Sequence, residues 1–201
     1  HSLRRRQRQM CIRDRSEAAI AANQTIKMRT YLLDELETTS NISVMTYKMP
    51  YLSGNLQEAT ALVFYPHTEK PKNGWRIVVW THGTVGVGDA CAPSNNPINT
   101  NFKVTADALL KEGYVIIAPD YEGLGTPGIH PYLHLKSEAL SAIYGVIALK
   151  NASTDFSGDW MVVGQSQGGQ AALGTAEYAN DDSRFKGAVA GAPAASLLEI
   201  I

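Results

Sequence analysis

The residues best suited to chemistry lie in the run Trp160 to Ala172, which contains Gly-Gln-Ser-Gln-Gly. A short apolar segment precedes this motif, and small residues follow it as expected for the start of a helix. A nucleophilic serine must project from a sharp strand-to-helix turn, where flanking side chains would collide with the strand and helix. Gly164 and Gly168 stand two residues on either side of Ser166 and remove that collision. The pattern therefore predicts that the Ser166 hydroxyl is a nucleophile.

Two backbone N–H groups are candidates to stabilise the oxyanion that such a nucleophile creates. The N–H of Gln167 is expected at a helix N-terminus, where amides lack intrahelical partners and the dipole favours negative charge. A second apolar segment, residues 75–80, ends in Thr81-His82-Gly83-Thr84. In an α/β-hydrolase the loop after the third strand supplies the other donor, and we expect it to be the N–H of Thr84.

Three other interpretations of these loops are weaker. The glycines after residue 82 follow the order Gly-x-x-Gly-x-Gly instead of Gly-x-Gly-x-x-Gly, and no Gly-Lys-Ser/Thr follows, which disfavours nucleotide binding. His82 and Asp120 precede the serine, whereas the triad of this fold runs serine, acid, histidine, so we expect structural roles for both. His130 and His134 have the i, i+4 spacing of a helical metal site, but Pro131 disfavours a helix there. We predict no metal site and no cofactor.

Composition limits the class of protein. The chain has 201 residues, of which 44% are hydrophobic, and this suits one globular domain with a sizeable core. No apolar run approaches the roughly 20 residues of a membrane span. Residues 1–15 hold six of the 18 basic residues and one of the 19 acidic residues, which leaves a net charge of −6 for the rest. That acidic balance argues against a nucleic-acid partner.

The basic stretch at residues 1–15 carries Arg-Gln-Met-Cys-Ile-Arg-Asp, a string similar to translated sequencing adapter. A twin-arginine signal would need a following apolar region, and none is present. We interpret residues 1–15 as a non-native leader and residues 16–39 as an N-terminal helical segment, on the weak apolar pattern from Ala18 through Leu36. Residues 40–201 then form the α/β domain.

That domain is predicted to begin with an antiparallel hairpin and to continue as alternating strands and helices. Turn-forming Ser53-Gly54-Asn55 separates two alternating segments, Ile42–Tyr47 and Ala59–Tyr65. Short continuous apolar runs thereafter indicate a mostly parallel sheet covered on both faces. The expected strands are 75–81, 114–119, 159–163 and 186–190, and the expected helices are 101–112, 136–150 and 168–180.

Six segments together resemble the secretory lipase family of α/β-hydrolases, over about residues 40–199. They are His82-Gly83-Thr84, Asp89-Ala90-Cys91-Ala92-Pro93-Ser94, Asp120-Tyr121-Glu122-Gly123-Leu124-Gly125-Thr126, His130-Pro131-Tyr132, Gly164-Gln165-Ser166-Gln167-Gly168-Gly169-Gln170 and Gly191-Ala192-Pro193-Ala194-Ala195. The resemblance implies hydrolysis of carboxylic esters, often acyl glycerols, through an acyl-enzyme on Ser166 with Thr84 and Gln167 as oxyanion donors. It implies a small-molecule or lipid ester as substrate, and an extracellular or periplasmic location.

The resemblance also implies parts that the 201 residues do not include. The family's Asp and His follow a cap insertion after Gly-Ala-Pro-Ala-Ala, so the fold is expected to be truncated before the cap and last strands, and the fragment inactive. Cys91 is expected to be half of a disulfide with a later cysteine. We expect His130 and Tyr132 at the rim of the site.

Two alternatives remain open from sequence. A serine peptidase or an acyltransferase of the same fold would share this elbow, since one fold supports several chemistries. A non-catalytic binding protein on a hydrolase scaffold is a further alternative. An amide substrate would discriminate the peptidase, and failure to react with a fluorophosphonate would favour the binding protein.

Overall fold

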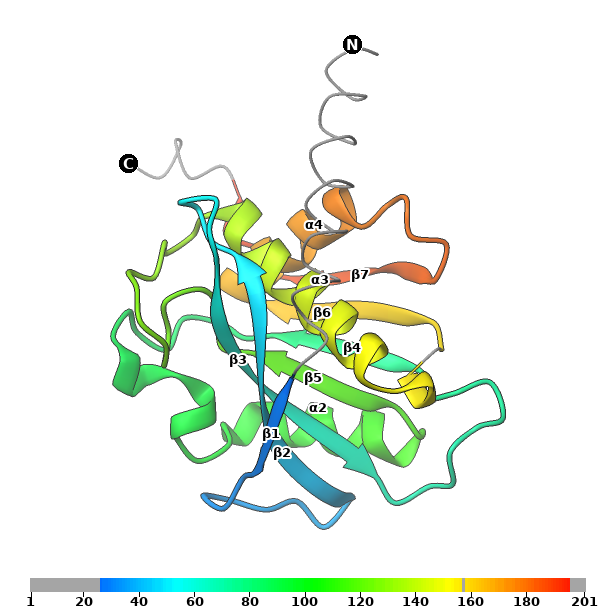
Figure 1. The fold of residues 1–201 in the computed structure, drawn as a ribbon. Coiled ribbons are helices and arrows are strands. Elements are labelled where there is room, and N and C mark those ends of the chain that lie inside the picture. The colour runs from blue at the N-terminus through cyan, green and yellow to red at the C-terminus, as the bar shows by residue number, and fades with distance from the viewer. Residues whose placement is uncertain (1–25, 157, 196–201) are drawn as a thin grey trace.

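A single sheet organises the chain in the computed structural model, which describes residues 26–156 and 158–195 (Figure 1). Its order is β1-β2-β3-β5-β4-β6-β7. The strands are β1 (Lys27–Thr30), β2 (Thr39–Pro50), β3 (Leu56–Pro66), β4 (Ile77–Thr81), β5 (Val115–Pro119), β6 (Trp160–Gln165) and β7 (Phe185–Gly191). The helices are α2 (Thr100–Lys111), α3 (Leu135–Ala152) and α4 (Gln167–Tyr178), with short 3₁₀ turns η1 (Asp89–Cys91), η2 (Pro93–Asn95) and η3 (Thr154–Phe156).

The predicted entry hairpin is confirmed. Strands β2 and β3 pair antiparallel from Asn41–Tyr65 to Pro50–Leu56. Their turn contains Gly54 with φ +83°, a left-handed conformation that glycine adopts without a Cβ penalty. Strand β3 then pairs antiparallel with β5, and β5, β4, β6 and β7 run parallel. This is the mixed α/β sheet that the sequence predicts.

The predicted N-terminal helix is wrong over the residues that can be compared. Lys27–Thr30 forms a strand that pairs antiparallel with Thr46–Ser43 of β2. All four side chains of β1 are exposed, so a hydrophobic pattern could not have identified it. The edge of β2 supplies the backbone partners, and this long-range pairing overrides a weak local preference. Residues 16–25 lie outside the described residues.

Helices cover both faces of the sheet, as Figure 1 shows with α3 and α4 on one side and α2 on the other. Alternate residues of the central strands enter the two cores. In β5, Ile117 packs in the core beneath α3 and α4, while Ile116 packs against α2. Burial on both faces explains why these strands are continuously apolar. Because β4, β5, β6 and β7 run parallel, their carboxyl ends lie at one edge of the sheet.

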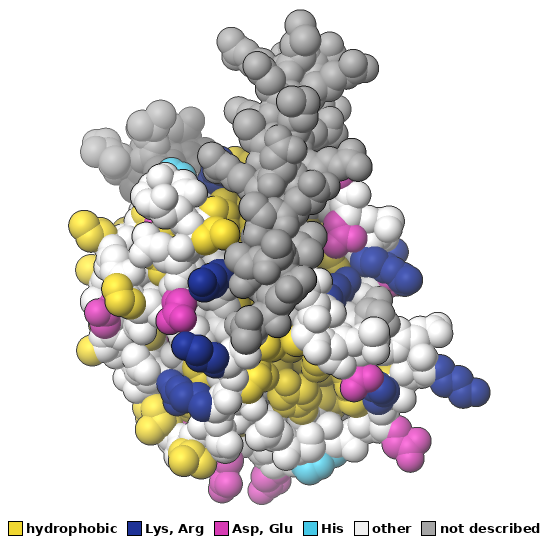
Figure 2. Space-filling view, in the orientation of Figure 1, with side chains coloured by type: hydrophobic (Ala, Val, Ile, Leu, Met, Phe, Trp, Pro, Cys, Tyr) yellow, Lys and Arg dark blue, Asp and Glu magenta, His cyan; other side chains and the backbone are white. Residues whose placement is uncertain are grey.

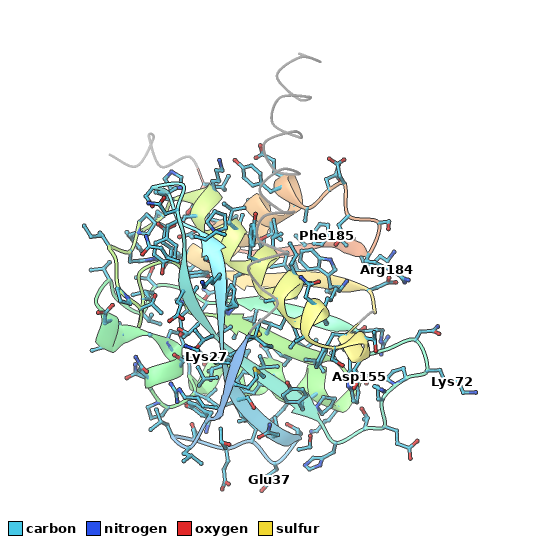
Figure 3. All side chains as sticks on the ribbon, viewed as in Figure 1. Lys27, Glu37, Lys72, Asp155, Arg184 and Phe185 are labelled. Atoms are coloured by element: carbon cyan, nitrogen blue, oxygen red, sulfur yellow. The ribbon has the colours of Figure 1, made fainter. Side chains whose placement is uncertain are left out.

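Aromatic packing holds β7, the strand at one edge of the sheet. Phe185, labelled in Figure 3 at the start of β7, lies against Trp160 with ring centroids 4.6 Å apart. The Trp160 indole N–H donates to Asp182 Oδ2 at 2.7 Å. On the face shown in Figure 2, the Lys and Arg side chains (dark blue) are interspersed with the Asp and Glu side chains (magenta). Among the described helices, none has both the length and the apolar character to cross a membrane.

Candidate active site

Ser166 occupies the sharp turn between β6 and α4. Its φ is +59° and its ψ is −121°, a conformation that costs a non-glycine residue of order 1–3 kcal/mol. It precedes the first helical residue, Gln167, and its side chain is half-buried. The turn therefore has the geometry predicted from Gly-x-Ser-x-Gly.

The flanking glycines are required by close backbone contacts. A Cβ on Gly164 would lie 2.0 Å from the Gly168 carbonyl oxygen and 2.1 Å from Thr81 Oγ1. A Cβ on Gly168 would lie 1.8 Å from the Thr81 carbonyl oxygen. The Thr81 hydroxyl itself donates to the Gly168 carbonyl at 2.8 Å. Strand β4 and helix α4 thus meet with no room for a side chain.

The last residue of β7 and the residues that follow it support the serine from another side. The Ser166 N–H donates to the Gly191 carbonyl at 2.9 Å, and the Ala194 N–H donates to the Ser166 carbonyl at 3.4 Å. A Cβ on Gly169 would lie 2.7 Å from the Gly191 oxygen. The Gly191-Ala-Pro-Ala-Ala motif, to which sequence alone gave no role, therefore contacts the elbow directly.

The loop that follows β4 lies against the serine. A Cβ on Gly83 would lie 3.2 Å from the Gln165 carbonyl oxygen and 3.6 Å from Ser166 Cβ. The next residue, Thr84, is exposed, and its hydroxyl is hydrogen-bonded to the Tyr132 hydroxyl at 2.9 Å. Tyr132, 45% exposed, thus lies beside this loop at the surface, in accord with a place at the rim. The two predicted oxyanion residues therefore belong to segments that meet at Ser166.

His82 is engaged in the structure of that loop. Its Nδ1 lies 2.7 Å from the Gly83 carbonyl oxygen and its Nε2 lies 3.2 Å from the Asp120 carbonyl oxygen. Its ring packs on Tyr121 at 4.2 Å between centroids. Burial lowers the pKa of His82, so the ring is neutral at pH 7. Both ring nitrogens face carbonyl groups, which agrees with the structural role predicted for this histidine.

Asp120 fastens two neighbouring segments beside the site. Its Oδ1 accepts the Ser94 N–H at 2.9 Å, and its Oδ2 accepts the Thr60 hydroxyl at 2.6 Å. The side chain is fully buried, and burial raises its pKa to about 6 against the effect of these donors. Asp120 therefore joins η2 to β3, as expected of a residue that holds a loop.

His130 lies inside the molecule, which corrects its predicted place at the rim. It is only 6% exposed. Its Nδ1 lies 2.9 Å from the Glu122 carbonyl oxygen, and its Nε2 lies 3.1 Å from Nε2 of the Gln167 side chain. The contact with α4 draws His130 inward, and no local pattern signals a contact across 37 residues. His134, the other histidine of the i, i+4 pair, accepts the Ser137 N–H at the start of α3.

Sequence reasoning missed Glu138. Its Oε1 accepts a hydrogen bond of 2.8 Å from Gln167 Nε2, and the residue is fully buried in α3. Burial raises the pKa of Glu138 to about 7, although the hydrogen bond from Gln167 opposes that shift. The sequence offers one signal for this role, which is that Glu138 is an acidic residue among the apolar residues of the predicted helix 136–150.

Cys91 is a free cysteine among the described residues. A Cβ on Gly86 would lie 2.5 Å from its sulfur, so the thiol packs against the loop that carries Thr84. The predicted disulfide with a later cysteine stays a prediction.

Comparison with known proteins decides the family. A family model described as secretory lipase matches residues 97–201, more than half of the chain. The chain belongs to the secretory lipase family. Its structural neighbours are lipases and esterases of the α/β-hydrolase fold, so the chain is a member of a hydrolase family. The comparison with curated proteins gave no match.

Three solved structures illustrate the likeness. Candida antarctica lipase A in its closed state is 18% identical with a TM-score of 0.66, over 83% of this chain and 41% of that one. A ligand-bound rice cell wall degrading esterase LipA from Xanthomonas oryzae is 26% identical with a TM-score of 0.56, over 72% of this chain and 39% of that one. A protein from Legionella pneumophila is 25% identical with a TM-score of 0.61, over 89% of this chain and 49% of that one. The chain thus spans less than half the length of these proteins.

Proposed function

We propose that the protein is a serine carboxylic-ester hydrolase that acts through an acyl-enzyme on Ser166. The observation that carries the proposal is the strained φ of +59° at Ser166, within a turn whose glycines leave no space for side chains. A serine held in this way at the end of a parallel strand is typical of a nucleophile. The lipase and esterase neighbours support an ester as the substrate class.

In the proposed mechanism, Ser166 Oγ attacks the ester carbonyl while its proton passes to a general base. The N–H groups of Thr84 and Gln167 hold the oxyanion of the tetrahedral intermediate. The carbon–oxygen bond to the alcohol breaks, and the alcohol leaves with the proton from the base. Water then attacks the acyl-enzyme, releases the carboxylic acid and restores the Ser166 hydroxyl.

The general base and its acidic partner are proposed to follow residue 201 in the protein. All five histidines of the sequence precede Ser166. His82 and His130, the two in the loops around the elbow, have both ring nitrogens in contact with other groups. The order serine, acid, histidine in this fold supports a base from later residues. The family name supports an extracellular location, which we also propose.

The test compares Ser166→Ala with Ser183→Ala in the complete protein that contains this chain. Ser183 is an exposed serine in the turn before β7 and serves as the matched control. We expect hydrolysis of p-nitrophenyl butyrate and palmitate to fall by about 10⁴-fold or more in Ser166→Ala, since loss of a nucleophilic serine has effects of that size. Ser183→Ala should match wild type.

Two further measurements separate ester hydrolysis from its alternatives. A fluorophosphonate should label Ser166, as located by mass spectrometry, and an amide with the same acyl group should turn over far more slowly than the ester. Preference for the amide would indicate a peptidase. Absence of both labelling and turnover would contradict the proposal and favour a binding protein.

A further inference from the structure

The side chain of Gln167 is held by two acceptors beneath the elbow. Its Nε2 lies 2.8 Å from Glu138 Oε1 and 3.1 Å from His130 Nε2. The Nδ1 of His130 faces the Glu122 carbonyl, which can only accept, so the ring proton is on Nδ1 and Nε2 is free to accept. Both amide hydrogens of Gln167 therefore have an acceptor. This arrangement fixes which way the side-chain amide points.

The three residues come from different parts of the fold. Gln167 is the first residue of α4, Glu138 lies in the first turn of α3, and His130 lies in the loop between β5 and α3. Figure 1 shows α3 and α4 together on one face of the sheet. We call the three the amide clamp, since it ties the first residue of α4 to the neighbouring helix and loop.

The amide clamp is a costly way to pack a core. Glu138 is 0% exposed, and its second oxygen, Oε2, has no hydrogen-bond partner among the described residues. Glutamate is almost never fully buried unless it is paired, because burial penalises the carboxylate. Burial accordingly raises the pKa of Glu138. A methionine would fill similar space without this cost, so packing alone does not account for a glutamate here.

The backbone of Ser166 and Gln167, next to the amide clamp, indicates what the clamp does. Ser166 is strained, and its peptide bond with Gln167 is held at the carbonyl end by the N–H groups of Gln170 and Ala194. The N–H of Gln167 is in the first helical turn, where no intrahelical carbonyl fixes its direction. The side chain of Gln167 adds a second anchor at the other end of that peptide, beside the N–H itself.

We propose that Glu138 is a positioning residue: through the side chain of Gln167 it fixes the direction of the Gln167 N–H toward the oxyanion. The proposal rests on the ester hydrolysis proposed above. Glu138 touches neither substrate nor the reacting atoms. Its effect should be confined to the transition state, because the oxyanion is absent from the bound ester.

The test is the effect of Glu138→Met and Glu138→Gln on kcat and KM in the complete protein, with p-nitrophenyl butyrate as the substrate. Glu138→Met removes the acceptor for Gln167. We expect kcat to fall about tenfold or more, because misplacing an oxyanion donor forfeits part of the 10²–10³ that losing one costs. The KM should change less than about threefold, as expected for an interaction made only in the transition state. Glu138→Gln keeps an oxygen acceptor and should recover most of kcat.

Two comparisons exclude a purely structural effect. Glu69→Met, at an exposed glutamate in the loop after β3, should leave both constants unchanged. Gln167→Met keeps the backbone N–H but removes the amide, and it tests the amide clamp from its other end if Glu138→Met folds poorly. The kcat of the double variant Glu138→Met/Gln167→Met should lie within about twofold of that of either single variant, since both changes break the same contact. Multiplied losses would overturn the proposal.

The outcomes separate this inference from the proposed function. If wild type hydrolyses the ester, Ser166→Ala does not, and both Glu138→Met and Gln167→Met keep full kcat, the positioning role alone is overturned. A matching loss in the Met and Gln variants of Glu138 would also overturn it, since one of them keeps the acceptor. A wild-type protein that hydrolyses no ester would overturn both proposals.

Discussion

Replacing Gly168 by alanine should separate β4 from α4. The new Cβ would lie 1.8 Å from the Thr81 carbonyl oxygen, 2.5 Å from its carbon and 2.8 Å from the His82 oxygen. All three atoms are backbone, so no side chain can turn away. Ordinary contact would require the two elements to move apart by about 1.5 Å. Overpacking usually costs 1–3 kcal/mol, and with rigid backbone on both sides we expect about 3 kcal/mol or more.

Urea unfolding followed by tryptophan fluorescence measures this loss, because buried Trp160 lies in the strand that leads to the elbow. Gly88→Ala is the matched control, since a Cβ there has nothing within 4 Å and the residue has a φ of −97°. The control should stay within about 1 kcal/mol of wild type. A Gly168→Ala protein as stable as the control would refute the close approach of β4 and α4. Where the variant folds, a displacement of this size should also lower kcat about 10²-fold.

Three other substitutions test separate contacts. Burial raises the pKa of Asp120 to about 6, so its contribution to stability is complete below about pH 4 and is lost as pH rises through 6. Asp120→Asn should remove about 2 kcal/mol of this pH dependence, measured as the difference in urea unfolding free energy between pH 4 and pH 7. Tyr132→Phe removes the partner of the Thr84 hydroxyl and should lower kcat/KM about fivefold, the equivalent of a ~1 kcal/mol hydrogen bond, whereas an unchanged value would show that the pair does not order the loop. Asp182→Ala leaves the buried Trp160 indole N–H without its acceptor and should cost about 1–3 kcal/mol of unfolding free energy, with a shift in tryptophan emission; wild-type stability would contradict the hydrogen bond.

The strands and helices that build the site could be predicted because their signals are local. Burial on both faces gives the central strands continuous apolar runs, such as Val115 to Ala118, that a sequence displays directly. The elbow was predictable for a similar reason. A Cβ on Gly164 or Gly168 would lie 1.8–2.1 Å from neighbouring atoms, so only glycine fits at these two positions. Strand β1 gave no such signal, because its side chains are exposed and only its backbone is paired.

The positions of single polar side chains were harder to predict. His130 and Tyr132 are two residues apart, and both were expected at the rim. Tyr132 reaches the exposed Thr84, whereas His130 turns inward to Gln167, far along the chain. No periodic pattern in the sequence predicts whether a polar side chain points inward or outward. Its direction depends on which hydrogen-bond donor or acceptor lies within about 3 Å in the folded state. The partnership of Gln167 with Glu138 was hidden for the same reason.

The strained conformation of Ser166 is held by backbone groups of α4 and of residues 191–194, and this makes the end of β7 and the residues after it part of the site. The Ser166 N–H donates to the Gly191 carbonyl, while the Ser166 carbonyl accepts from the N–H groups of Gln170 and Ala194. At about 1 kcal/mol each, these three hydrogen bonds offset the 1–3 kcal/mol that such a conformation costs. Two of the three involve residues 191–194. A change that shifts this segment would therefore release the turn and move the nucleophile, even though no side chain of the segment need touch the substrate.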